Sequence, residues 1–142
     1  MNNYDYRVNL VDDYLKKLNL SNEIKKYYSG RNILVTGGAG AIGSNLVTTL
    51  SKLVGNDGMI IVLDNLSAIK GDEPIDLPPL SNMMFVNGDI RNDIDLKRVF
   101  REKPTIVYHL AAFFANQNSV DYPETSADVD IHGMIKLLDL SQ

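Results

Sequence analysis

Three glycines stand three residues apart, at Gly37, Gly40 and Gly43, in the segment 36–43 (TGGAGAIG). The segment follows a short apolar run, residues 32–36, and opens a stretch with helical spacing. At such a turn the free N–H groups of the first helical turn can bind phosphate oxygens, and the helix dipole adds roughly half a positive charge. We expect Gly37 to turn the chain off the strand, Gly40 to let a pyrophosphate approach the backbone, and Gly43 to let the helix pack closely on the strand. The alternative is a glycine-rich turn with no ligand.

A carboxylate stands at the end of the next apolar run. Asp64 follows residues 59–63 (MIIVL) and comes 21 residues after Gly43, where a carboxylate can accept hydrogen bonds from an adenosine ribose. It would also repel a 2′-phosphate, since two unit charges about 4 Å apart cost about 4 kcal/mol at an effective dielectric of about 20. Half of this repulsion energy would still favour NAD over NADP by more than roughly tenfold. Residues 65–69 contain no arginine that could reverse the preference. The alternative for Asp64 is a helix cap or a turn residue.

Small and polar residues also follow the third and fourth apolar runs: Gly88, Asp89 and Ile90 after the third, and Leu110, Ala111 and Ala112 at the end of the fourth. Ligands in parallel sheets bind at the carboxyl ends of the strands, and small residues there let a flat cofactor lie close. We expect Asp89 to reach the amino group of an adenine and Ile90 to pack on its ring. Taken alone, Asp89 would be a turn residue and the two alanines would be packing residues.

The elements that must position these residues follow from the apolar pattern. Strands are expected at residues 32–36, 59–63, 83–87 and 105–110. Helices are expected over 41–53, over a stretch that Asn92 or Asp93 can cap and that ends before Pro104, and over about 125–140. Residues 65–82, with three prolines, are expected to form a polar connection with little regular structure. The alternation indicates an α/β fold, a Rossmann-type doubly wound parallel sheet that is truncated after about four strands.

Residues 1–29 differ from the rest because they are polar and rich in Tyr, Asn and Lys. Apolar residues recur at helical spacing before residue 19, and Ser21 can cap a second short helix that runs through Tyr28. Asp12 and Asp13 stand four residues before Lys16 and Lys17, the favourable order for ion pairs within one helix. We expect a helical N-terminal extension over 1–29 and a partial dinucleotide-binding domain over 30–142. The extension is expected to pack against the domain, with docking of a partner chain as the alternative.

Composition excludes several classes of function. The net charge is −4 and no large basic cluster is present, which argues against nucleic acid and membrane surfaces as partners. The absence of cysteine excludes disulfides, thiolate nucleophiles and thiolate metal sites. The two histidines, His109 and His132, have no metal-ligand partner at useful spacing, so no metal site is expected. The longest apolar stretch is too short to cross a bilayer, and a cytoplasmic protein is expected.

Four segments together resemble the NAD-dependent epimerase/dehydratase family, a branch of the extended short-chain dehydrogenases that acts on nucleotide sugars: residues 36–43 (TGGAGAIG), 64–67 (DNLS), 88–91 (GDIR) and 109–112 (HLAA). The resemblance covers residues 31–142. It implies NAD contacts at Gly37, Gly40, Ala41, Ile42, Asp64, Asn65, Asp89, Ile90, Leu110, Ala111 and Ala112, and Gly43 completes the set from the glycine spacing. It also implies hydride transfer at a sugar carbon through a transient keto-sugar.

The sequence departs from this family at three places. In members similar to UDP-galactose 4-epimerase, a lysine near the nicotinamide ribose follows the His-x-Ala-Ala stretch, and Phe114 stands there instead, which argues against 4-epimerase activity. The family's Asn-x-x-Gly step matches residues 130–133, so the role of the Asn falls to Asp130. The family's general base is a Tyr with a Lys four residues later, and none of the seven tyrosines has that partner. We expect the Tyr/Lys pair beyond residue 142.

The leading hypothesis is therefore the NAD-binding part of a nucleotide-sugar epimerase or dehydratase, with no catalytic residue in this chain. The nucleotide sugar would bind in the complete enzyme. The outer flank of the fourth strand would be unpaired, which favours homo-oligomers or other association. One alternative is a non-catalytic dinucleotide-binding or regulatory module that docks a partner chain. Another is a second chain that supplies the Tyr/Lys half.

Overall fold

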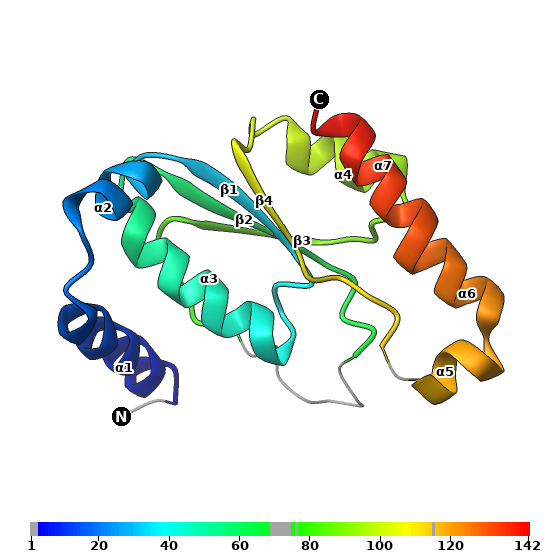
Figure 1. Ribbon diagram of the computed structural model, residues 1–142, viewed down its shortest axis with the longest axis horizontal. Helices are drawn as coiled ribbons and strands as arrows, with labels where there is room; N and C mark the ends of the chain where they lie inside the picture. Colours follow the sequence, from blue (N-terminus) through cyan, green and yellow to red (C-terminus); the bar gives the residue numbers. More distant parts are fainter. Residues whose placement is uncertain (1–2, 69–74, 76, 115) are drawn as a thin grey trace.

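The computed structural model describes residues 3–68, 75, 77–114 and 116–142. Of the polar connection predicted at 65–82, residues 69–74 and 76 lie outside the described residues, and the others form neither helix nor strand. None of the helices described is long and apolar enough to cross a membrane. The chain forms a parallel sheet with helices on both faces (Figure 1).

Among the described residues, the sheet has four parallel strands in the order β3-β2-β1-β4. Their bounds are β1 (Asn32–Thr36), β2 (Met59–Asp64), β3 (Met83–Asn87) and β4 (Ile106–His109). In the centre, Val35 of β1 lies between Val62 of β2 and Tyr108 of β4. The predicted Rossmann-type α/β fold is confirmed, and β4 is one residue shorter at each end than the predicted strand.

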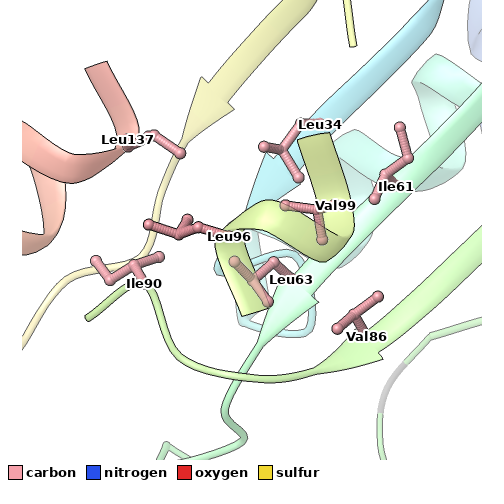
Figure 2. Close-up of a cluster of buried hydrophobic side chains, with 8 residues drawn as sticks. All are labelled: Leu34, Ile61, Leu63, Val86, Ile90, Leu96, Val99 and Leu137. Atoms are coloured by element: carbon pink, nitrogen blue, oxygen red, sulfur yellow. The ribbon is translucent and has the colours of Figure 1, made fainter. Parts of the chain in front are cut away.

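Successive residues of the central strands point to opposite faces of the sheet. One face packs against α4 (Asp93–Phe100) and α7 (Met134–Leu140) through the cluster Leu34, Ile61, Leu63, Val86, Ile90, Leu96, Val99 and Leu137 (Figure 2). The other face packs against α3 (Ala41–Val54) through the cluster Ile33, Val35, Val47, Leu50, Val54, Ile60 and Val62. Because β1 and β2 are buried on both faces, their sequences are continuous apolar runs.

Local capping sets the beginning of two predicted helices. Asn92 caps α4 by accepting the N–H of Ile94 through its side-chain oxygen at 2.8 Å. Ser21 caps α2 (Asn22–Tyr28) by accepting the N–H of Ile24 at 3.3 Å. Both caps were predicted because Asn and Ser favour this position, where their side chains satisfy a free N–H group.

The last helical region differs from the single helix predicted over 125–140. The chain first forms a separate helix, α5 (Asn116–Asp121). It then forms α6 (Pro123–Ala127), the π-helical turn η1 (Asp128–Gly133) and α7, and these three elements make one long continuous helix (Figure 1). A Cβ atom at Gly133 would lie 2.7 Å from Cδ1 of Ile90, so only glycine fits this close approach. In the same turn, Asp130 accepts the N–H of Phe113 at 2.8 Å. These tertiary contacts fall on the π-helical turn, and the helical period of the sequence does not reveal them.

The first helix of the extension, α1 (Asn3–Leu18), lies against α3. Lys52 of α3 donates to Asp12 at 3.1 Å, and the hydroxyl of Tyr4 donates to the carbonyl of Ile75 at 2.8 Å. Asp12 therefore pairs with α3 and not, as predicted, with a lysine of its own helix, where Asp13 and Lys16 form a 3.7 Å pair instead. A helix pattern cannot show this because the partner lies 40 residues away in the chain.

The second helix of the extension, α2, joins the sheet. Tyr28 packs in the α3-side cluster, and its hydroxyl oxygen lies 2.7 Å from that of Tyr108 on β4. Burial, followed by the hydrogen bond with Tyr28, raises the pKa of Tyr108 to about 12, so Tyr108 is neutral at physiological pH. The extension thus packs against the rest of the chain, and the division into separate units at residue 30 stays a prediction.

A buried hydroxyl connects the ends of β1 and β4. Thr36 is fully buried, and its oxygen accepts the N–H of Ala111 at 3.3 Å and lies 2.7 Å from Nδ1 of His109. In the contact between Thr36 and His109 either group can donate, and the tautomer of His109 decides which one does. Burial lowers the pKa of His109, and the charge of Asp130 opposes that shift only in part.

The packing of α4 predicts that substitutions at two of its residues differ greatly in their effect on stability. Leu96 is 0% exposed and Ile94 is 76% exposed. Leu96→Ala should lower the free energy of unfolding by about 2–5 kcal/mol, because it leaves a cavity between the sheet and the helices. Ile94→Ala, the matched control, should change it by less than about 0.5 kcal/mol. Urea denaturation followed by circular dichroism measures both, and equal losses would contradict the observed packing.

The state of His109 predicts a pH dependence of stability. Because its pKa is lower in the folded protein than its ordinary value, the unfolded chain takes up the proton first as pH falls. Stability is then fully present above about pH 6.5 and is lost as pH falls through the folded-state pKa. Unfolding free energies of the wild type and of His109→Gln, measured between about pH 7 and pH 5, should converge as pH falls. A constant difference across this range would show that His109 is not the group responsible.

Candidate functional site

The candidate site lies where the carboxyl ends of the four strands meet. The chain leaves β1 toward β2 on one side and returns to β4 on the other side, so β1 and β4 flank the point where the strand order reverses. In doubly wound sheets, ligands bind in the crevice outside the strand ends at this point. All the site residues predicted from the sequence follow one of these four strand ends.

Gly37 makes the sharp turn after β1. Its φ is +68°, and a Cβ atom there would lie 2.6 Å from the backbone nitrogen of Ala111 and 2.8 Å from the carbonyl oxygen of Leu110. Its N–H donates to the carbonyl of Leu63 at 2.8 Å. The turn therefore contacts the ends of both neighbouring strands, β2 and β4.

The other two predicted glycines have different surroundings. A Cβ atom at Gly43 would lie 2.2 Å from the carbonyl oxygen of Gly37 and 2.6 Å from Cα of Gly38. Gly43 thus lets the beginning of α3 pack directly on the glycine turn that follows β1, and its role in packing the helix on the strand stays a prediction. A Cβ atom at Gly40 would have one neighbour within 4 Å, the carbonyl oxygen of Gly37 at 3.4 Å, so its side faces open space among the described residues.

Gly38 is a site residue that the spacing argument missed. A Cβ atom there would lie 2.7 Å from Cγ1 of Val62 and 3.3 Å from Cγ2 of Val47. Gly38 therefore lets the turn lie directly on the core between β2 and α3. The available signal was the glycine pair at 37 and 38, because two adjacent glycines are more than one sharp turn requires.

The first turn of α3 carries unsatisfied backbone N–H groups. Its N-cap is Gly40, no described side chain caps the helix, and its first turn contains no acidic residue. The first N–H groups of any α-helix lack partners within the helix. Ala41 and Ile42 are exposed, Ile42 at 75%. The helix beginning is thus open and carries the positive end of the dipole of a 14-residue helix.

Asp64 at the end of β2 points toward the glycine turn. One carboxylate oxygen accepts the N–H of Ala39 at 2.9 Å, and the other accepts the N–H of Leu66 at 2.8 Å. A carboxylate can accept about four hydrogen bonds. The described residues occupy two of these positions, so Asp64 both fastens the turn to β2 and keeps acceptor capacity for a ligand.

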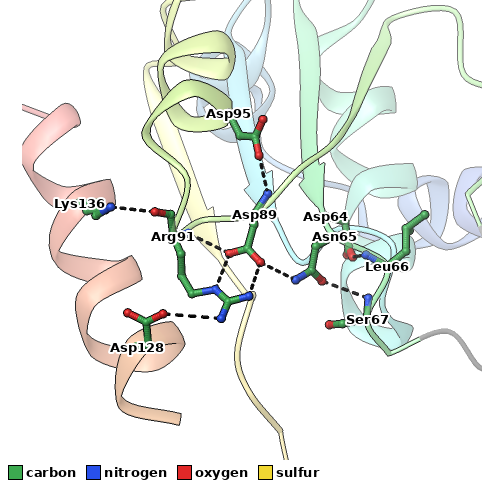
Figure 3. Close-up of polar contacts among 9 residues, drawn as sticks. All are labelled: Asp64, Asn65, Leu66, Ser67, Asp89, Arg91, Asp95, Asp128 and Lys136. Carbon is green, nitrogen blue, oxygen red and sulfur yellow. Dashed lines mark hydrogen bonds and ion pairs between the residues drawn. The ribbon is translucent and has the colours of Figure 1, made fainter. Parts of the chain in front are cut away.

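Asp89, after β3, is surrounded by donors (Figure 3). Arg91 supplies three of them, its backbone N–H at 2.9 Å, Nε at 3.0 Å and Nη2 at 2.7 Å, and Asn65 supplies the fourth at 2.9 Å. The hydrogen bond from the Arg91 side chain is the main reason why the pKa of Asp89 falls to about 2. Asp89 is therefore ionised at physiological pH.

The remaining predicted residues lie at the same edge but differ in exposure. Ile90 is 4% exposed and packs in the cluster of Figure 2, which does not fit the predicted packing of its side chain on an adenine ring. Its backbone remains at the strand end. Leu110 is partly exposed, Ala111 is anchored by Thr36, and Ala112 is exposed.

Two of the three departures from the family pattern, Asp130 and Phe114, also lie here. Asp130 of η1 holds the segment after β4 by accepting the N–H of Phe113, and it also accepts the hydroxyl of Ser126 at 3.2 Å. Phe114 is 86% exposed. Within the described part of the chain, no group of three His, Cys, Asp or Glu side chains could hold a metal ion. The site therefore consists of backbone N–H groups, carboxylates and small residues.

Comparison with known proteins gives consistent matches to this region. CDP-paratose 2-epimerase of Salmonella typhi is 38% identical over 110 residues, which cover 75% of this chain and 31% of that protein. The structure of an epimerase from Methanothermobacter thermautotrophicus is 47% identical with a TM-score of 0.75, over 84% of this chain and 34% of that one. The structure of WbmF from Bordetella bronchiseptica in complex with NAD+ is 32% identical with a TM-score of 0.70, over 80% and 33%. The chain spans about a third of the length of these relatives.

The family assignment rests on the part of the chain that carries the site. Residues 34–142 match the family described as GDP-mannose 4,6 dehydratase. This region contains the glycine turn, the carboxylates after β2 and β3, and nearly all of the sheet. The chain belongs to the GDP-mannose 4,6 dehydratase family of NAD-dependent nucleotide-sugar epimerases and dehydratases, and it corresponds to the N-terminal part of its relatives.

Proposed function

We propose that this chain binds NAD at the carboxyl edge of its sheet. The diphosphate would lie at the beginning of α3, the adenosine ribose on Asp64, the adenine near the end of β3, and the nicotinamide near the end of β4. The proposed contacts are those predicted from the sequence: Gly37, Gly40, Ala41, Ile42, Gly43, Asp64, Asn65, Asp89, Ile90, Leu110, Ala111 and Ala112. Ile90 would contribute through its backbone because its side chain is buried.

The observation that carries this proposal is the open beginning of α3 beside a carboxylate with spare acceptor positions. The uncapped N–H groups and the helix dipole suit a diphosphate. Gly40 faces open space, so two phosphates can approach the backbone there. Asp64 is held 2.9 Å from the N–H of Ala39 and can still accept ribose hydroxyl groups. The residues present therefore fit the cofactor, and WbmF, the relative solved with NAD+, has the same fold.

We further propose that the chain provides the cofactor half of a nucleotide-sugar epimerase or dehydratase. Bound NAD would accept a hydride from a sugar carbon and return it, which gives a transient keto-sugar. The chain's own residues would orient the cofactor and exclude water from beneath it. No tyrosine in the sequence is followed by a lysine four residues later, so the proton-transfer pair would come from polypeptide outside these 142 residues. Phe114, in place of the family's lysine, supports a reaction other than 4-epimerisation.

Cofactor preference tests the role of Asp64. Isothermal titration calorimetry should show NAD binding more than about tenfold tighter than NADP, because the carboxylate repels a 2′-phosphate. Asp64→Asn should weaken NAD binding and bring the affinities for NAD and NADP closer together, since it removes the charge of the side chain at nearly constant size. Asp57→Asn, in the exposed turn before β2, is the matched control. Absence of NAD binding at millimolar concentration would remove the proposed function.

Two glycine variants separate binding from folding. Gly40→Ala should lower the free energy of unfolding by only about 1 kcal/mol or less, because the cost is that of alanine at a helix N-cap and the side of Gly40 faces open space. The same methyl group should weaken NAD binding at least about tenfold by blocking the approach of the diphosphate. Gly43→Ala should instead lower stability by about 2–3 kcal/mol, since no Cβ atom fits against the turn. Unchanged NAD affinity in Gly40→Ala would place the diphosphate elsewhere.

A further inference from the structure

The two carboxylates of the candidate site differ in how many donors already surround them. The described residues give two hydrogen bonds to Asp64 and four to Asp89. Four is about the full capacity of a carboxylate. An adenine amino group can therefore bind Asp89 only when one of its present donors leaves.

Arg91 is the donor that cannot readily leave. Its guanidinium bonds both oxygens of Asp89 side by side, and its own backbone N–H binds the same carboxylate. On its other side, Nη1 lies 3.6 Å from a carboxylate oxygen of Asp128 in η1. The carbonyl of Arg91 accepts a hydrogen bond from Lys136 of α7 at 2.7 Å (Figure 3). Arg91 is thus fixed from both sides, and it fixes the plane of the Asp89 carboxylate.

Asn65 is the donor that can leave. Its side chain is exposed, and its bond to Asp89 is a single 2.9 Å contact from Nδ2 to Oδ2. Within the described part of the chain, its oxygen accepts one N–H, that of the nearby Ser67 at 3.0 Å. A side-chain amide and the 6-amino group of adenine are both planar N–H donors. The position of the Asn65 amide on Asp89 is therefore a position that a purine amino group fits.

We propose that Arg91 is a positioning residue that determines purine specificity: it holds the Asp89 carboxylate in one orientation, so that Oδ2 exchanges the Asn65 amide for the 6-amino group of the cofactor's adenine. This inference rests on the proposed binding of NAD. It goes further because it assigns a role to Arg91 and Asn65 in the contact that Asp89 is expected to make with the adenine amino group. A fixed, ionised carboxylate accepts hydrogen bonds only, so it favours a 6-amino group and repels a 6-oxo group.

The test compares NAD with nicotinamide hypoxanthine dinucleotide, which carries a 6-oxo group in place of the 6-amino group and is otherwise the same. Calorimetry on the wild-type protein should give at least about tenfold weaker binding of the hypoxanthine analogue, the range for losing a hydrogen bond to a charged group. In Arg91→Ala the two guanidinium bonds are lost, and the backbone N–H of residue 91 does not by itself fix the plane of the carboxylate. The ratio should then fall to about threefold or less. Arg91→Lys should also lose most of the ratio, because an ammonium cannot form the two parallel bonds.

Two control variants separate positioning from stability. Asp128→Ala removes the link between Arg91 and η1 and should lower the melting temperature while keeping the NAD/analogue ratio. Arg98→Ala removes an exposed arginine of α4 and should change neither the melting temperature nor the NAD/analogue ratio. Asn65→Ala removes the competing amide and should keep the NAD/analogue ratio at the wild-type value or above it. A ratio that falls toward one in that variant would overturn the exchange step.

The outcomes distinguish this inference from the function on which it rests. Lack of NAD binding by the wild type removes the proposed function. NAD binding with equal affinity for the hypoxanthine analogue leaves the proposed function intact and overturns the role of Asp89 and Arg91. A wild-type ratio retained in a folded Arg91→Ala or Arg91→Lys protein shows that Arg91 is only a structural link.

Discussion

The candidate site depends on one contact between two pieces of backbone, where the first turn of α3 rests on the glycine turn. The carbonyl of Gly37 lies where a side chain of Gly43 would begin, at 2.2 Å from a Cβ atom placed there. The same turn is held by the carbonyl of Leu63 and by the carboxylate of Asp64. On its other flank it meets the backbone of Ala111. Strands β1, β2 and β4 and helix α3 thus have one meeting point, which leaves no room for side chains.

Around this point the chain uses the same residue type for three purposes. Asp64 closes the turn and keeps free acceptor positions, Asp89 is filled by Arg91 and Asn65, and Asp130 holds the segment after β4. Their surroundings decide these roles. A neighbouring guanidinium lowers the pKa of Asp89 to about 2, whereas backbone N–H groups orient the other two. These three carboxylates therefore serve as joints of the fold.

The sequence predicted those parts of the structure that depend on local rules. The strands at 32–36 and 83–87 are those observed, and the caps at Ser21 and Asn92 are formed. Strands buried on both faces are continuous apolar runs, and capping needs only neighbouring residues, so both leave a clear signal.

The features that the sequence did not reveal depend on residues far away in the chain. Gly43 packs on the glycine turn that follows β1, and Asp12 pairs with Lys52 of another helix. Ile90 points into the core because Gly133 gives it space, which no periodic pattern shows. The glycine spacing predicted a turn at the end of a strand, which the structure has at Gly37, but which atoms meet there follows from tertiary packing.

The π-helical turn η1 has a consequence for how the last helix can change. An α-helix advances about 100° per residue, and a π-helical turn holds one residue more than an α-helical turn, so everything beyond it is rotated by roughly a quarter of a turn. That rotation points Leu137 into the core and Lys136 at Arg91, while Asp130 still faces the segment after β4. Removing a single residue between 128 and 133 would convert this turn to an α-helical one and leave the downstream side chains near their present directions. A one-residue deletion is therefore compatible with the packing in η1 but not within α7, where it would turn every later side chain by about 100°.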